Sequence, residues 1–238
     1  MSAQPPFQTR MLPPPDLWHN LPAAQRRSCL QAAARMIRAM QTLTARQSQV
    51  VHAILEQREF VEWEHYPDDD VRDPQHFSQY FYHAHAGALR PFDEHGHFHL
   101  FIHADDAAIR RPRAGREMAP AHLLALSMDA HGQPKGLFCT NRWVTKGPWL
   151  SQQESLRGLQ LFNVKGRRGH APVNHFLRAL LDLYQPLIPG LLQQRDLILQ
   201  QLCATRDIRS VFADKSIEVL CYQPIDPGQD IARLEMLA

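Results

Sequence analysis

The sequence predicts an α+β protein in which a central antiparallel β-meander sheet has N-terminal and C-terminal helices packed on one face. Segments with a helical rhythm of apolar residues lie at both ends of the chain, and segments with strand-like alternation lie between them. The chain has 238 residues, of which 44% are hydrophobic and 21% are charged. It is therefore long enough to bury a large core.

The N-terminal part of the chain is predicted to hold an arm and two helices. Residues 1–20 are rich in proline and are expected to form an extended arm, with residues 21–238 as a single α+β domain. From Ala23 to Met40, apolar residues recur about every 3.6 positions, which indicates a helix. Thr44 is a candidate N-cap for a second helix.

The middle of the chain is predicted to form a meander of four or five strands. Phe60–Glu64 alternates apolar and charged residues, as a half-buried strand does. The proline and aspartates of His65–Asp70 predict a turn after it. Further strands are expected at residues 79–85, 94–103, 123–128 and 137–144, and a hairpin connection is expected at residues 129–134.

The C-terminal part is predicted to return to helices. Val173–Tyr184 and Leu187–Leu202 are amphipathic, Ile217–Cys221 is typical of one late strand at the sheet edge, and residues 228–238 are expected to form a terminal helix.

Histidines are concentrated in the predicted sheet. Eight of the 14 histidines fall between positions 65 and 103, namely His65, His76, His83, His85, His95, His97, His99 and His103. Side chains two apart in a strand point to the same face. His83 and His85 therefore share a face of one predicted strand. On the next predicted strand, one face holds His95, His97, His99 and His103. A symmetric hairpin would place His83 opposite His97 and His85 opposite His95.

Histidines at facing positions are suited to binding a metal ion. Their Cβ atoms lie about 4.5–5.5 Å apart, so two imidazoles can converge on one ion. We therefore expect a metal site with ligands drawn from His83, His85, His97, His99, His95 and His65. Imidazole binds Zn, Fe, Cu and Ni alike, so the expected cofactor is a divalent transition metal of open identity. A hydrogen-bonded polar network or a solvated sheet face is the alternative interpretation of the same pattern.

Two further residues are candidates for catalytic roles. Glu94 directly precedes the second histidine set and is a candidate ligand, ligand-orienting partner or general base, the alternative being a turn carboxylate. Arg142 is expected inside a strand, where a guanidinium needs an anionic partner from the protein or a substrate. The basic loop Lys165–His170 offers a second contact to an anionic substrate.

Composition limits the classes of partner. The formal net charge is only +2, which gives no electrostatic case for nucleic acid. No run of about 18 apolar residues and no signal-peptide-like segment occurs, so no membrane association and a cytoplasmic location are expected. The four cysteines lie far apart, so nitrogen and oxygen ligands must hold any metal. A small-molecule substrate, a homo-oligomer or a protein partner is compatible with the sequence.

Two resemblances add to this interpretation. His95–Phe101 is similar to the histidine-triad motif, which implies attack on a nucleotide phosphorus by His97, although Gly96 departs from the hydrophobic residue usual there. Over most of its length the chain resembles an uncharacterised bacterial family of unknown function, on the segments Glu64–Pro67, Ser78–His85, Glu94–Phe101 and Thr140–Thr145.

The function that these observations favour is that of a histidine-rich, metal-binding protein, most plainly a metal-dependent enzyme with its site on the antiparallel sheet. A histidine-triad-like nucleotide phosphoryl or nucleotidyl hydrolase and a non-catalytic partner subunit are the two alternatives.

Overall fold

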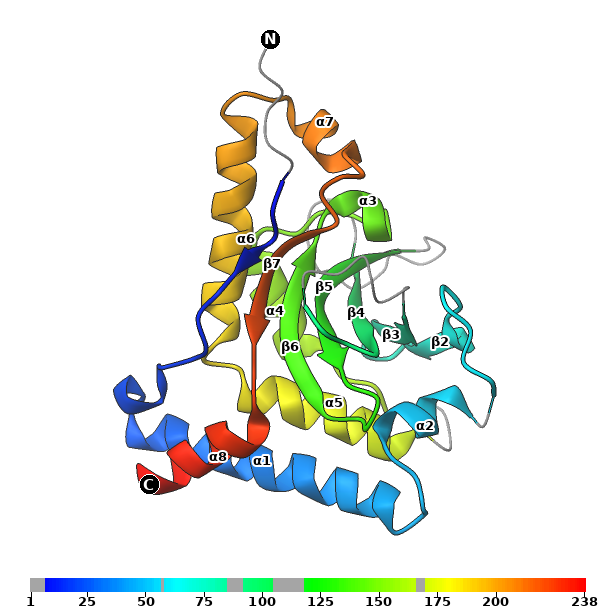
Figure 1. The fold of residues 1–238 in the computed structure, drawn as a ribbon, viewed down its shortest axis with the longest axis vertical. Coiled ribbons are helices and arrows are strands. Elements are labelled where there is room, and N and C mark those ends of the chain that lie inside the picture. The colour runs from blue at the N-terminus through cyan, green and yellow to red at the C-terminus, as the bar shows by residue number, and fades with distance from the viewer. Residues whose placement is uncertain (1–6, 57, 85–91, 105–117, 166–169) are drawn as a thin grey trace.

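The central feature of the structure, a computed structural model, is one sheet of seven strands (Figure 1). Residues 7–56, 58–84, 92–104, 118–165 and 170–238 are described. The strands lie in the order β1-β7-β6-β5-β4-β3-β2, so β2 to β7 form a continuous antiparallel meander and β1 adds in parallel to β7. Their bounds are β1 Arg10–Met11, β2 Tyr66–Asp73, β3 Ser78–His83, β4 Gly96–Ala104, β5 Ala119–Met128, β6 Pro134–Thr140 and β7 Val219–Pro224. The predicted α+β class is confirmed.

Helices precede, interrupt and follow the strands. They are α1 Ala23–Thr44, α2 Val50–Leu55, α3 Arg142–Thr145, α4 Gln152–Leu161, α5 Ala171–Leu183, α6 Ile188–Cys203, α7 Ile208–Ala213 and α8 Pro227–Met236. Helices α1 and α5 pack against each other beside the sheet (Figure 1). The candidate cap Thr44 is instead the last residue of α1, because Gln49 caps α2 by accepting a hydrogen bond from the backbone of Val51.

The two faces of the sheet differ in chemistry. Phe98, Leu100 and Ile102 of β4 are fully buried in the same hydrophobic core as Tyr80 and Tyr82 of β3, and this core includes the apolar faces of the helices. Alternation along β3 and β4 places the intervening residues, among them the histidines, on the opposite face. The helices thus cover one face of the sheet and leave the histidine face on the other side.

The N-terminal arm packs on the domain from its first described residues. Strand β1 pairs with β7, and the indole Nε1 of Trp18 donates to Asp230 at 3.0 Å. The hydroxyl of Tyr184 donates to the other carboxylate oxygen of Asp230 at 2.8 Å. One buried aspartate therefore links the arm, α5 and α8.

The prediction of a strand at Phe60–Glu64 and a turn at His65–Asp70 is wrong. Strand β2 begins at Tyr66, inside the predicted turn. It is an edge strand with an irregular register between Tyr66 and Val71, and edge strands and bulges tolerate proline and aspartate. Asp70 is held there because Gln79 on β3 donates to its carboxylate at 2.6 Å.

The predicted strand at residues 137–144 ends earlier, and Arg142 does not lie in a strand. Strand β6 stops at Thr140, and the side chain of Asn141 accepts a hydrogen bond from the backbone of Arg142 at 2.8 Å. This cap starts the short helix α3, because an asparagine side chain competes with the strand ladder for backbone donors.

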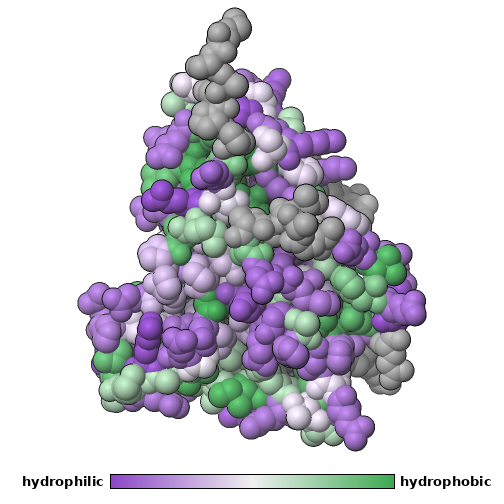
Figure 2. All heavy atoms as spheres, in the orientation of Figure 1, coloured by the Kyte–Doolittle hydropathy of each residue, from purple (hydrophilic) through white to green (hydrophobic). Residues whose placement is uncertain are grey.

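The face of the molecule shown in Figure 2 is mainly hydrophilic, with hydrophobic side chains in small groups. The large hydrophobic residues that are exposed include Trp63, Ile208 and Met236. Within the described part of the chain, no helix combines the length and the apolar character needed to cross a membrane.

Candidate metal centre

Three histidines from adjacent strands meet on the face of the sheet opposite the helices. His83 ends β3, and His97 and His99 lie near the start of β4. The register pairs His83 with His97 directly, as the symmetric hairpin predicts, and pairs Phe81 with His99. Since residues 97 and 99 are two apart, all three imidazoles project from the same side.

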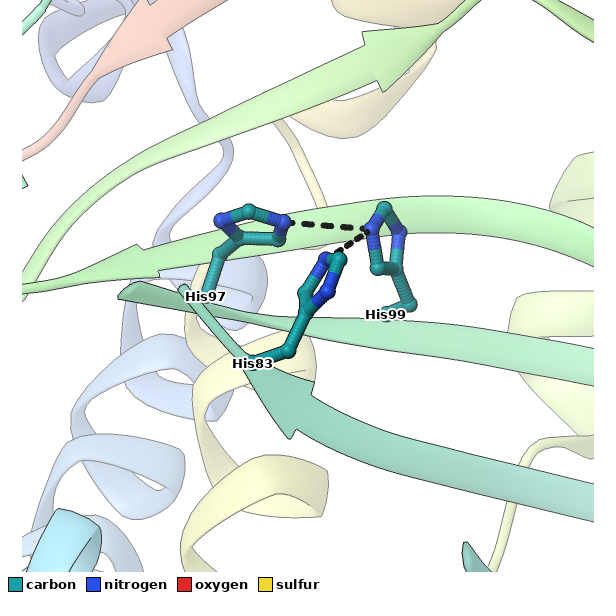
Figure 3. Close-up of side chains that lie close together, drawn as sticks. All are labelled: His83, His97 and His99. Atoms are coloured by element: carbon teal, nitrogen blue, oxygen red, sulfur yellow. Dashed lines mark hydrogen bonds between the residues drawn. The ribbon is translucent and has the colours of Figure 1, made fainter. Parts of the chain in front are cut away.

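The three rings converge through their Nε2 atoms (Figure 3). The Nε2 atom of His99 lies 3.1 Å from Nε2 of His97 and 3.1 Å from Nε2 of His83. One nitrogen from each residue lies within 4.8 Å of the others. Of the described residues, these three form the group of histidines, cysteines and carboxylates able to hold a metal ion.

This spacing fits coordination by imidazole. Nitrogens bound at about 2.0–2.1 Å to a tetrahedral ion lie about 3.3–3.4 Å from one another. The two observed separations of 3.1 Å differ from this by a few tenths of an ångström.

The three rings are buried. His97 is 0% exposed, His99 1% and His83 8%. Phe81 and Phe138 pack against the rings, with centroids 5.2 Å from those of His99 and His97 respectively. Such surroundings have a low effective dielectric, so a cation bound by the nitrogens would interact with them more strongly than in water.

Glu94 orients one of the three rings. Its Oε1 atom accepts a hydrogen bond from Nδ1 of His97 at 2.9 Å. A carboxylate only accepts, so Nδ1 carries a proton, and Nε2 is the nitrogen turned toward the cluster. This carboxylate–histidine arrangement is the one that fixes metal-binding histidines in other proteins.

His122 on β5 is a fourth histidine at the site, and the sequence analysis did not identify it. Its Nε2 lies 2.9 Å from Nδ1 of His99, and its Nδ1 lies 3.4 Å from the hydroxyl of Thr140. Desolvation, followed by the positive charge of Arg195, lowers the pKa of His122 to about 3. The ring is therefore neutral at physiological pH, and its Nε2 can accept a hydrogen bond from a protonated Nδ1 of His99. The sequence analysis did not place His122 in the sheet, because the strand was predicted to begin only at Leu123, one residue after it, whereas β5 begins at Ala119.

The other predicted ligands lie in different surroundings. His65 stacks on Phe81 with ring centroids 3.7 Å apart, and its centroid lies 5.6 Å from that of His83. His95 lies 2.7 Å from the hydroxyl of Tyr82, on the helix-covered face. Its ring departs from the predicted alternation because β4 begins only at Gly96. The predicted ligand His85 lies outside the described residues.

Arg142 lies near His122 and not among the three converging rings. Its Nε donates to the carbonyl of Gly147 at 3.1 Å. It lines a small internal space together with His122, Thr140 and Arg195. The structure therefore brings Arg142 toward the histidine that contacts His99, but not into contact with the three converging rings.

These features describe an α+β protein with a buried cluster of three histidines that can hold a metal ion. The chain belongs to the family described as a domain of unknown function (DUF6969), whose model matches residues 30–225. This confirms the prediction of an uncharacterised family that spans most of the chain. No curated protein and no solved structure matches it.

Proposed function

We propose that this protein binds one divalent transition-metal ion through Nε2 of His83, His97 and His99, and that it is a metal-dependent enzyme. The convergence of three imidazole nitrogens from two paired strands carries this proposal. Three histidine ligands leave a fourth position of a tetrahedral ion for water or substrate, as in catalytic zinc sites.

The ion would supply Lewis acidity and a bound water of lowered pKa. The protein's own contribution is orientation and exclusion of solvent. Glu94 sets the tautomer of His97, and His122 contacts the ring of His99 from the other side. A described candidate for a further ligand is His65, whose ring stands edge-on to that of His83. Arg142 remains our candidate contact for an anionic substrate.

The same geometry gives little support to histidine-triad chemistry. There, His97 would have to present a ring nitrogen to a nucleotide phosphorus. Its Nδ1 is engaged with Glu94, its Nε2 faces His99, and the residue is 0% exposed. Both ring nitrogens of His97 are thus engaged within the protein, whereas a nucleophile needs a free nitrogen to attack its substrate.

Metal analysis of protein purified without a polyhistidine tag tests the proposal. We expect about one equivalent of a transition metal per chain, either as purified or after reconstitution and desalting. The variant His99→Ala should lose the ion, because it removes the nitrogen that both other rings approach. His131→Ala, in the exposed turn between β5 and β6, is the matched control and should bind as the wild type does.

Cobalt substitution separates an enzyme site from a closed structural one. An ion with an open position should change its visible absorption when azide or cyanide is added, because these anions compete with bound water. A wild-type protein that holds less than about a tenth of an equivalent after reconstitution would show that the proposed ligands do not form a metal site.

A further inference from the structure

The largest cavity among the described residues lies on the other side of the sheet from the histidines. It has a volume of about 580 Å³ and is formed by α1, the first half of α5 and the segment before α5. Its wall includes Asn174, whose Oδ1 accepts a hydrogen bond from Tyr80 of the helix-covered face. The cavity is therefore separate from the proposed metal centre, and the inference below is independent of the proposed function.

Small side chains create the hollow. Ala39 of α1 and Ala179 of α5 lie in its floor, are 5% and 1% exposed, and leave space where longer side chains would fill the gap between the helices. Val164 closes the floor from the preceding segment and is equally buried. A volume of this size is in the range of about 300–1,000 Å³ that small-molecule sites have.

The rim of the cavity is strongly basic. Among the described residues, no carboxylate lines it. The cationic side chains that line it are five, namely Arg35, Arg38, Arg46, Lys165 and Arg178. The whole chain has a formal net charge of only +2, so this group concentrates positive charge at one place. On α1, positions 35, 38 and 42 follow helical spacing, which brings their side chains to one face, and Arg46 lies in the turn that follows the helix.

Within the described part of the chain, one carboxylate pairs with two of these five cations. Asp182 serves two of the cations, because Arg35 contacts its Oδ2 at 2.8 Å and Arg178 contacts its Oδ1 at 2.5 Å. Arg178 also donates to the carbonyl groups of Leu159 and Phe162, which fixes its guanidinium. Among the described residues, no carboxylate forms an ion pair with the side chain of Arg38, Arg46 or Lys165.

We propose that this cavity binds a small molecule that carries two or more phosphate groups. Guanidinium groups match phosphate oxygens with paired hydrogen bonds, and a multiply charged anion relieves the repulsion among the five cations. The first turn of α5, with Ala171 and Pro172 in the wall, adds the partial positive charge of a helix N-terminus. A hollow of about 580 Å³ has room for a small anion rather than for a length of polymer.

Calorimetric titration of the full chain with pyrophosphate tests this inference, at ionic strength held constant with chloride. We expect one pyrophosphate per chain. The double variant Arg38→Gln/Arg46→Gln should weaken binding by at least about tenfold, because it removes two charged donors. Both side chains are exposed, Arg38 on α1 and Arg46 in the turn after it, and glutamine is a good helix former at position 38, so the fold should be retained.

The matched control is Arg27→Gln/Arg209→Gln, which removes the same charge from two exposed positions outside the cavity. It should bind pyrophosphate within about twofold of the wild type, since only screened long-range attraction is lost. Thr42→Glu is a second, independent variant that places a carboxylate on the cavity wall and should abolish binding.

Three results would overturn the inference. They are no saturable binding to the wild type, equal binding by wild type and the cavity variants, or binding of a single-stranded oligonucleotide in preference to pyrophosphate.

Discussion

The Oε1 atom of Glu94 lies 2.9 Å from Nδ1 of His97, and both side chains are nearly inaccessible to solvent, at 5% and 0% exposure. This contact decides which nitrogen of His97 carries its proton. It also turns Nε2 of the same ring, 3.1 Å from Nε2 of His99, toward the cluster. The carboxylate acts on the site through the histidine, so it is a positioning residue.

Replacing Glu94 with glutamine should weaken metal binding by about 10–100-fold, as loss of such ligand-orienting partners does elsewhere. The amide keeps the size of the carboxylate but supplies no charge to stabilise the protonated Nδ1. A competition titration against a chromophoric chelator measures the affinity. Glu62→Gln, at an exposed position before β2, is the matched control and should bind as tightly as the wild type. Equal metal affinities for Glu94→Gln and Glu62→Gln would show that Glu94 does not orient His97 for metal binding.

The variant His122→Phe should also weaken metal binding, by about tenfold. Phenylalanine occupies the space of the imidazole but cannot accept a hydrogen bond from Nδ1 of His99, which lies 2.9 Å from Nε2 of His122. The ring of His99 would then lose the contact that fixes its orientation. The same chelator titration checks this, with His131→Phe in the exposed turn as the control. Unchanged affinity would show that His99 is held by its neighbours in β4 alone.

Removing core volume beneath the histidines should lower stability. Leu100 is fully buried on the helix-covered face of β4, so Leu100→Ala should cost about 2–5 kcal/mol of unfolding free energy. Urea denaturation of the metal-free protein measures this. Ile37→Ala, at a site 40% exposed on α1, should cost much less, within about 1 kcal/mol. A loss at Leu100 no larger than at Ile37 would contradict the assignment of the core face.

Acidification should remove a contribution from Asp214. The hydroxyl of Ser216 and then the guanidinium of Arg206 hold the pKa of this carboxyl below its usual 3.8. Because the folded-state pKa is depressed, the unfolded chain takes up the proton first. The stabilisation is present above about pH 4 and is lost as the pH falls through the folded-state value.

Asp214→Asn should therefore lower Tm by about 2–4 °C at pH 7, as loss of about one charged hydrogen bond does in a chain of this size. The difference from the wild type should be smaller at pH 3 than at pH 7, because pH 3 lies below the unfolded-state pKa. Melting curves at both values test this, with the exposed Asp69→Asn as control. If the difference in Tm between the wild type and Asp214→Asn grew on acidification, the pKa of Asp214 would not be lowered by folding.

Alternation along the strands was predictable from local sequence. The period of two is set by backbone geometry, so the same-side placement of His97 and His99, and their meeting with His83, follow from the spacing once β3 and β4 pair. The amphipathic rhythm similarly predicts α1, α5 and α6 to within a few residues. These features depend only on residues close together in the chain.

The remaining features depend on contacts between distant segments. His122 meets His99 only because β5 pairs with β4 across an irregular register. His95 turns to Tyr82 because the ladder has not yet begun at that residue. Asn141 ends a strand because it can cap a helix, and Pro67 lies in a strand because that strand is at the edge. The basic cavity exists because α1 and α5 meet at alanines. Local periodicity says which side a residue lies on, whereas packing decides what it meets there.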